Sequence, residues 1–235
     1  MSCEAITWNR VIDGVHIWRA ALDGAGWPGP ERLPAPERER AATFLREDAR
    51  RRWLASRWAL RRVLATYLEV PAEAVEIEEG DRSKPRLRGD GPLRFNLSHS
   101  GGLALIAVTE GREVGVDLEL VEPGRDLVAL AERALGADAA AVRDASPADR
   151  PARFYAAWTH HEAQLKCLGV GLAGASLRSS TSEVQDRSLV TVADLPLFLC
   201  PAMPGKGTAE HAYAAAVAVA DRALGPLGCR TLRPG

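Results

Sequence analysis

The sequence has few cysteines, almost no net charge and no long apolar run. Its four cysteines lie far apart without a Cys-x-x-Cys pair, which excludes a disulfide framework or a zinc ribbon and indicates a reducing cytoplasm. A net charge of −1 gives no general attraction to nucleic acid or to an anionic membrane. The N-terminal residues lack an apolar signal region, and the longest apolar run, residues 212–220, is much too short to span a bilayer. We therefore expect a cytoplasmic protein that binds neither nucleic acid nor membrane.

The 235 residues suffice for one large domain or two small ones. Strand-like and helical segments occur in an order that repeats: strand, long helix and strands, then helices and strands. This order predicts an α+β fold of two pseudo-symmetric halves, residues 1–112 and 113–235. Residues 36–68 are strongly helical. Two strand-like segments joined by Glu110–Arg112 suggest a hairpin there.

The segment 154–172 predicts a partly buried helix with an unusual polar face. Trp158, Glu162 and Lys166 are spaced four residues apart and therefore share one side of the helix. A Glu–Lys pair at this spacing is commonly a surface ion pair worth about 0.2–0.5 kcal/mol, and that interpretation stays open. A His-Glu-x-x-His zinc site is excluded, because Leu165 stands where the second histidine is required.

Two acids interrupt an apolar strand-like segment. Asp117 and Glu119 are two residues apart, so their side chains point to the same face of a strand. Adjacent carboxylates repel each other unless a cation lies between them, and oxygen ligands suit Mg²⁺ or Mn²⁺. A solvated strand face explains the spacing equally well.

Polar residues also mark the strand-like segment before the acids. Asn96, Ser98 and Ser100 share one face of it, and His99 lies on the other face. A histidine at such a place is usually structural, but it can also donate a hydrogen bond to a phosphate.

Further positive charge comes from two other segments. Lys84 precedes Pro85 in a polar loop, and the arginines at positions 50–52 lie in the long helical segment, where by themselves they resemble a solvated face. Taken together, the acids, lysines, histidine and arginines are the groups needed to bind a pyrophosphate with Mg²⁺.

Three blocks of the sequence resemble the 4′-phosphopantetheinyl transferases. They are FNLSHS (95–100), VGVDLE (114–119) and the helical segment 154–172, which is similar to the family pattern W-[ST]-x-K-E-[AS]-x-x-K-x-x-G-x-G-L. Their order and separations agree, as do the weaker segments HIWRA, REDARRR and SKP, so the resemblance covers nearly the whole chain. It is closest to the longer, pseudo-dimeric type that activates carrier proteins of non-ribosomal peptide, polyketide and fatty-acid synthases.

The resemblance implies an enzyme, expected to be a monomer, with its active site between the two halves. It would transfer 4′-phosphopantetheine from coenzyme A to a serine of an acyl or peptidyl carrier protein. Adenosine 3′,5′-bisphosphate would be released, and Glu162 is the expected general base. The implied ligands of Mg²⁺ or Mn²⁺ are Asp117, Glu119 and Glu162. The implied contacts of coenzyme A are Lys166 and His99 at the phosphates, Lys84, Pro85 and Ser98 toward the adenosine, and Arg50 and Arg52 at the 3′-phosphate.

The chain departs from the family pattern in two places. His161 stands where the family usually has lysine, and Asp138 and Ala139 stand where many members have a glutamate. Leu120 and Val121, after the second acid, are expected in the carrier-docking surface. Two other functions remain as alternatives: a non-catalytic carrier-protein- or coenzyme A-binding protein of the same fold, and an unrelated Mg²⁺-dependent nucleotide hydrolase.

Overall fold

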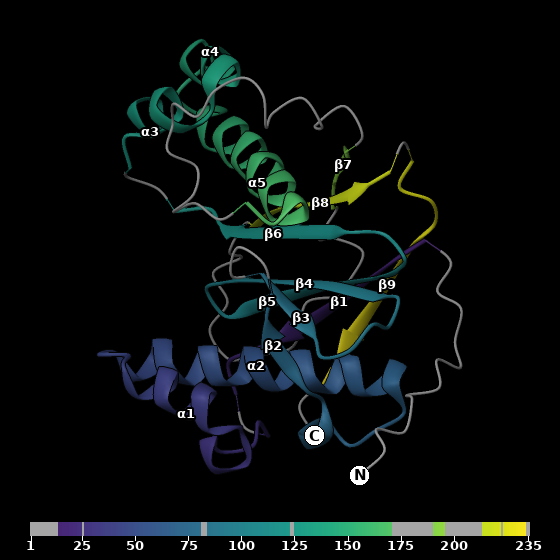
Figure 1. Ribbon diagram of the computed structural model, residues 1–235. Coiled ribbons are helices and arrows are strands. Elements are labelled where there is room, and N and C mark those ends of the chain that lie inside the picture. Colours follow the sequence, from purple (N-terminus) through teal and green to yellow (C-terminus); the bar gives the residue numbers. More distant parts are fainter. Residues whose placement is uncertain are drawn as a thin grey trace.

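The computed structural model describes residues 14–24, 26–80, 84–122, 125–170, 190–195, 213–221 and 223–233. Its helices and sheets form four layers (Figure 1). Helix α2 (Glu47–Leu68) covers one face of a four-stranded sheet, whose other face packs against a three-stranded sheet. Helix α5 (Arg150–Leu168) covers the outer face of that second sheet. The predicted α+β fold is confirmed.

The first sheet has the strand order β4-β5-β1-β9. Its strands are β4 (Leu93–Ser100), β5 (Leu103–Glu110), β1 (Val15–Ala21) and β9 (Leu227–Leu232). Strands β4, β5 and β1 are antiparallel, whereas β9 runs parallel to β1. The apolar stripe of α2, which includes Leu60 and Leu64, packs on Phe95 and Ile106 of this sheet.

The second sheet has the antiparallel order β6-β8-β7. Its strands are β6 (Val114–Leu120), β8 (Tyr213–Ala220) and β7 (Val190–Asp194). Valines of β6 and β8 face the first sheet. On the other face of β8, Ala216 and Ala218 pack against Ala163 and Cys167 of α5. The strand is rich in alanine because only small side chains let the helix lie this close to the sheet.

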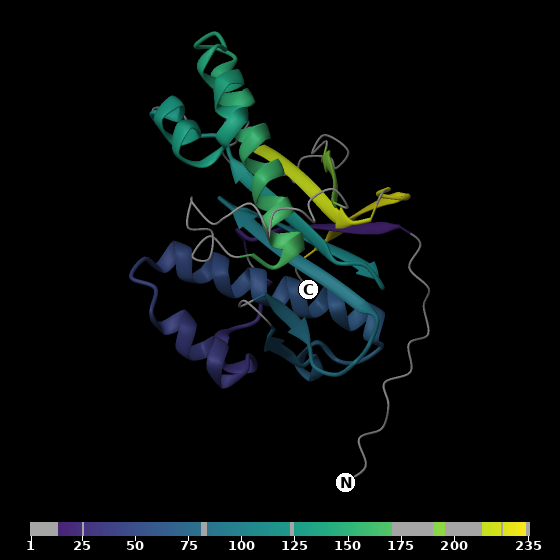
Figure 2. The same ribbon diagram turned by 45° about the horizontal axis from the view of Figure 1, so that its top comes forward.

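The remaining elements surround these layers. They are α1 (Ala35–Ala42), α3 (Leu127–Ala134), α4 (Ala139–Arg143), the small sheet of β2 (Ile77–Glu79) and β3 (Pro85–Leu87), and the 3₁₀ turns Pro30–Arg32, Ala72–Ala74 and Gly136–Asp138. Helices α3 and α4 pack on the N-terminal part of α5, as Figure 2 shows, through an apolar cluster that includes Leu127, Val142 and Phe154.

Two expectations about the elements are wrong. The helical segment 36–68 is broken, because α1 ends at Ala42 and α2 begins at Glu47. The hairpin lies at Gly101–Gly102, between β4 and β5, where Gly101 has a φ of +54° that glycine adopts readily. At the expected position, Glu110–Arg112 instead connects two different sheets. The boundary expected between residues 112 and 113 falls in this connection and stays a prediction, although β9 pairs with β1 of the first sheet.

Gly115 is the point where α5 lies closest to β6. A Cβ atom there would stand 2.0 Å from the carbonyl oxygen of Ala163 and 2.4 Å from the amide nitrogen of Cys167. Both are backbone atoms of α5, so neither can move without moving the helix. The absence of a side chain at this position sets the distance between the helix and the strand.

We predict that Gly115→Ala lowers the free energy of unfolding by about 1–3 kcal/mol or more, the usual cost of overpacking. The contrasting variant is Gly228→Ala in β9. The atom nearest to a Cβ added there is Cδ2 of the His16 ring, 3.3 Å away. Denaturant unfolding of both variants measures the difference. Equal losses would contradict the close approach of α5 to β6.

Candidate active site

The candidate site lies between β6 and α5. Gly115, Asp117 and Glu119 alternate along β6 on the face toward α5, and the Nζ atom of Lys166 on α5 lies 2.5 Å from Oδ1 of Asp117. Strand and helix periodicity thus bring the two sequence blocks together. Asp117 is 2% exposed and Glu162 5%, so neither belongs to a solvated face. Lys166 forms an ion pair with Asp117, which differs from the surface pair with Glu162 that the helix spacing alone allowed.

Side chains of β4 join the first sheet to the open edge of β6. Asn96 Oδ1 accepts a hydrogen bond from the backbone N–H of residue 116 at 2.9 Å. Ser98 Oγ accepts one from residue 118 at 3.2 Å, and Ser100 Oγ one from residue 120 at 3.0 Å. We call these three contacts the β4–β6 ladder. The sequence placed the three polar residues on one face, but no local signal indicated their partners.

The two serines of the ladder also reach the acids. Ser98 donates to Asp117 Oδ1 at 3.0 Å and accepts from Lys166 Nζ at 3.1 Å. Ser100 donates to Glu119 Oε2 at 3.1 Å. The acids are therefore held from the first sheet as well as from α5.

The charges of the site are unbalanced. Burial, followed by the negative charge of Asp117, raises the pKa of Glu162 to about 6, with Glu119 adding to the rise and Lys166 opposing it. Burial and Asp117 also raise the pKa of Glu119, against hydrogen bonds from Ser100 and Trp158. The indole of Trp158 stacks on the Phe154 ring at 5.8 Å between centroids. Among the described residues, the three carboxylates of the site share one ammonium group, that of Lys166.

The donor set suits a hard divalent cation in its chemistry. Asp117 Oδ2 and Glu162 Oε1 are buried and have no hydrogen-bond partner among the described residues. A buried carboxylate oxygen without a partner is costly, and a cation beside it would remove that cost. In the part of the chain that the structure describes, no three His, Cys, Asp or Glu side chains are arranged as a metal cluster. The fit rests on these two unpaired oxygens and on the excess of negative charge.

His99 lies on the face of β4 opposite the ladder, where part of its side chain is open to solvent and the rest is covered by the protein. Desolvation by its surroundings, then the positive charges of Lys166 and Arg57, lower the pKa of His99. The imidazole is therefore uncharged at neutral pH and has one N–H to donate.

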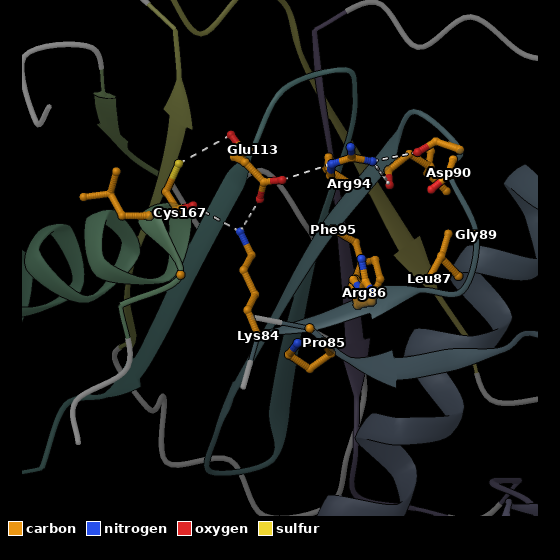
Figure 3. A pocket seen from close by; sticks show the side chains of 15 residues that line it. Lys84, Pro85, Arg86, Leu87, Gly89, Asp90, Arg94, Phe95, Glu113 and Cys167 are labelled. Atoms are coloured by element: carbon orange, nitrogen blue, oxygen red, sulfur yellow. Dashed lines mark hydrogen bonds and ion pairs between the residues drawn. The ribbon is translucent and has the colours of Figure 1, made fainter. Parts of the chain in front are cut away.

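Lys84 and Pro85 line a cavity of about 630 Å³ beside the C-terminus of α5 (Figure 3). The Lys84 ammonium donates to Glu113 Oε2 at 2.7 Å and to the carbonyl oxygens of Val114 and Cys167, each at 3.1 Å. None of the three candidate metal ligands lines this cavity. No sequence pattern indicated Glu113, an acid directly before β6 that binds this lysine.

Among the described contacts, the other expected residues form no hydrogen bond or ion pair with the three acids. Arg52 donates from Nε and Nη2 to the two carboxylate oxygens of Asp23, at 2.8 and 2.9 Å. Nη1 of Arg50 lies 3.7 Å from Oε2 of Glu47. Asp138 is exposed in a 3₁₀ turn. Ala139 is buried in the apolar cluster of α3, α4 and α5.

Comparisons with known proteins identify the family of this chain. The family model described as 4′-phosphopantetheinyl transferase, N-terminal, matches residues 30–111, and that of the 4′-phosphopantetheinyl transferase superfamily matches residues 113–217. The 4′-phosphopantetheinyl transferase HetI of Nostoc sp. is 38% identical over 173 residues, 68% of this chain and 71% of the relative. The chain belongs to the 4′-phosphopantetheinyl transferase superfamily.

Two further relatives of the same superfamily cover comparable shares. The 4′-phosphopantetheinyl transferase psf-1 of Bacillus pumilus is 32% identical over 168 residues, 71% of this chain and 70% of the relative. The enzyme AcpT of Escherichia coli is 35% identical over 182 residues, 76% and 87% respectively. The predictions of the family and of a transferase enzyme are confirmed. No helix among the described residues combines the length and apolar character needed to cross a membrane.

The raised pKa of Glu162 predicts a pH-dependent stability. Its pKa rises from an ordinary 4.5 to about 6 on folding, so the folded protein binds this proton more tightly than the unfolded chain. The resulting stabilisation is complete below pH 4.5 and is lost as the pH rises through 6. Glu162→Gln, which cannot ionise, should therefore be more stable than wild type above pH 6, by up to about 2 kcal/mol.

The measurement is denaturant unfolding of both proteins from pH 4.5 to 8 in the presence of a chelator. The difference should shrink toward pH 4.5. Asp138→Asn, at an exposed acid, is the control; because it keeps Glu162, its stability should follow that of wild type across this pH range. A Glu162→Gln protein less stable than wild type at pH 8 would contradict the described electrostatics.

Proposed function

We propose that this enzyme transfers 4′-phosphopantetheine from coenzyme A to a serine of an acyl or peptidyl carrier protein. The observation that carries the proposal is the convergence of Asp117 with Lys166 and Glu162, where two buried carboxylate oxygens have no partner among the described residues. Such a site can bind a divalent cation and a pyrophosphate together. Acids that stand apart on a solvated surface cannot do so. Membership of the superfamily supports the same reaction.

Each charged group has a proposed role. Asp117, Glu119 and Glu162 hold Mg²⁺ or Mn²⁺, which when bound neutralises charge on the pyrophosphate. Lys166 donates two of its three N–H groups to Ser98 and Asp117. Among the described contacts this leaves the third N–H to reach a phosphate oxygen. His99, uncharged at neutral pH, donates one hydrogen bond to a phosphate.

Glu162 is the proposed general base. The carrier serine oxygen forms a bond to the β-phosphorus of coenzyme A, and the bond from that phosphorus to the leaving phosphate oxygen breaks. The serine proton passes to Glu162, and adenosine 3′,5′-bisphosphate leaves. A carboxylate with a pKa of about 6 is mostly ionised at neutral pH and is a stronger base than an ordinary glutamate.

The adenosine end is proposed to lie toward the cavity lined by the stem of Lys84 and by Pro85. Arg50 and Arg52 are the proposed contacts of the 3′-phosphate, for which Arg52 must share its bonds with Asp23. The carrier domain is proposed to dock near Leu120 and Val121, with the enzyme acting as a cytoplasmic monomer that requires neither nucleic acid nor membrane.

The test is a mass assay with coenzyme A, Mg²⁺ and a panel of peptidyl, polyketide and fatty-acid carrier domains. Transfer adds the mass of phosphopantetheine to one serine. The alternative, a non-catalytic carrier- or coenzyme A-binding protein of the same fold, gives complex formation without any mass gain. Hydrolysis of coenzyme A with no carrier modified would indicate the nucleotide hydrolase instead.

Removal of either strand acid should abolish transfer without unfolding the protein. Asp117→Ala and Glu119→Ala each remove a proposed metal ligand. Each also removes part of the repulsion between the carboxylates, which opposes folding when no metal is bound. Circular dichroism checks the fold, and the mass assay measures turnover at saturating Mg²⁺. Near-normal turnover of either variant would contradict the ligand assignment.

The base assignment predicts unequal effects of two conservative variants. Glu162→Gln keeps the size of the side chain but removes the proton acceptor, and general-base catalysis is typically worth about 10²–10⁴ in rate. Asp138→Asn changes an exposed residue of the 3₁₀ turn and should leave kcat almost unchanged. The comparison is made at saturating coenzyme A and Mg²⁺. If Asp138→Asn is as damaging as Glu162→Gln, the proton goes to Asp138.

A further inference from the structure

All hydrogen-bonding capacity of the Ser98 hydroxyl is used within the protein. A serine hydroxyl has one hydrogen to donate and two lone pairs to accept. Ser98 Oγ donates to Asp117 Oδ1 at 3.0 Å, and it accepts from Lys166 Nζ at 3.1 Å and from the Leu118 N–H at 3.2 Å. The residue is only 6% exposed. The hydroxyl hydrogen therefore has a fixed direction, toward Asp117.

These three bonds join three elements at one atom. Ser98 belongs to β4, Asp117 and Leu118 to β6, and Lys166 to α5. We propose that Ser98 is a positioning residue, which orients the Asp117 carboxylate and the Lys166 ammonium, and that its hydroxyl does not contact coenzyme A. This inference rests on the proposed function and revises the contact that the family resemblance implied for Ser98.

The orientation of Asp117 follows from where the bonds end. Both Ser98 and Lys166 donate to Oδ1, whereas Oδ2 is buried without a partner among the described residues. Two donors on one oxygen decide which oxygen of the carboxylate is left to face the site. Groups that orient a ligating carboxylate in this way commonly affect activity about 10–100-fold when they are removed.

The neighbouring rung of the ladder provides a matched control. Asn96 is also buried, at 7% exposure, and it also accepts one N–H of β6, that of Val116. No hydrogen bond between Asn96 and an acid or a lysine of the site occurs among the described contacts. Loss of Asn96 thus removes a ladder contact without releasing Asp117 or Lys166.

Two Ser98 variants separate hydrogen bonding from packing. Ser98→Ala removes the hydroxyl, and Ser98→Cys keeps a side chain of similar shape that hydrogen-bonds weakly. In the mass assay we expect both to lower kcat roughly 10–100-fold with little change in the KM for coenzyme A. Asn96→Ala should lower the melting temperature to an extent similar to Ser98→Ala and should leave kcat close to wild type.

A second readout does not depend on turnover. Amide hydrogen exchange followed by NMR should show that Leu118 loses protection in Ser98→Ala, whereas Val116 loses protection in Asn96→Ala. Unchanged protection of Leu118 would overturn the inference, whatever the activity.

Three kinetic results would also overturn it. They are a raised KM with unchanged kcat in the Ser98 variants, equal loss of kcat in Asn96→Ala and Ser98→Ala, and normal kcat in Ser98→Ala. The wild type is measured in the same assay, so failure of the proposed function appears as an inactive wild type. Failure of this inference appears as an active wild type with one of these patterns.

Discussion

The fold depends on the way β4 holds the open edge of β6. An edge strand presents backbone N–H groups that need partners, and direct strand pairing would have fused the two sheets into one. Instead, Asn96, Ser98 and Ser100 accept these N–H groups with their side chains. The two sheets can then stack face to face, with the valines of β6 in the shared core. Because a one-residue slip reverses the faces of a strand, the ladder also fixes the face on which Asp117 and Glu119 stand.

The second constraint is the short distance between β6 and α5. Gly115 and the alanines of β8 leave no bulk under the helix, so Glu162 and Lys166 lie directly over the acids. The same closeness removes water from the carboxylates and raises the pKa of Glu162 to about 6. The site is thus less stable than an apolar contact of equal size would be, which is common where function requires charges to be gathered.

Local periodicity predicted the parts of this arrangement that depend on a single element. The spacing of four residues placed Trp158, Glu162 and Lys166 on one helix face, and alternation placed the acids on one strand face. Periodicity could not predict which strands pair. Strands β5 and β6 are both mostly buried, so their sequences give the same signal whether they lie in one sheet or in two. The pairing of β9 with β1 joins residues more than 200 positions apart, and no local signal reports it.

The family resemblance predicted which residues matter, but not what their bonds are used for. Lys84 and Ser98 were both expected to contact coenzyme A. In the structure, the donors and acceptors of both side chains are hydrogen-bonded to other protein atoms. A sequence motif preserves a residue type, whereas the number of donors and acceptors around it appears only in three dimensions.

The two roles proposed for Glu162 act on its pKa in opposite directions. A divalent cation beside the carboxylate favours the ionised form and lowers its pKa, which weakens it as a proton acceptor. Burial and the charges of Asp117 and Glu119 raise the same pKa. Next to the same cation, an exposed glutamate would therefore be a poorer base than Glu162. The burial that destabilises the site without ligand is what would allow a single carboxylate both to bind the metal and to accept the proton of the carrier serine.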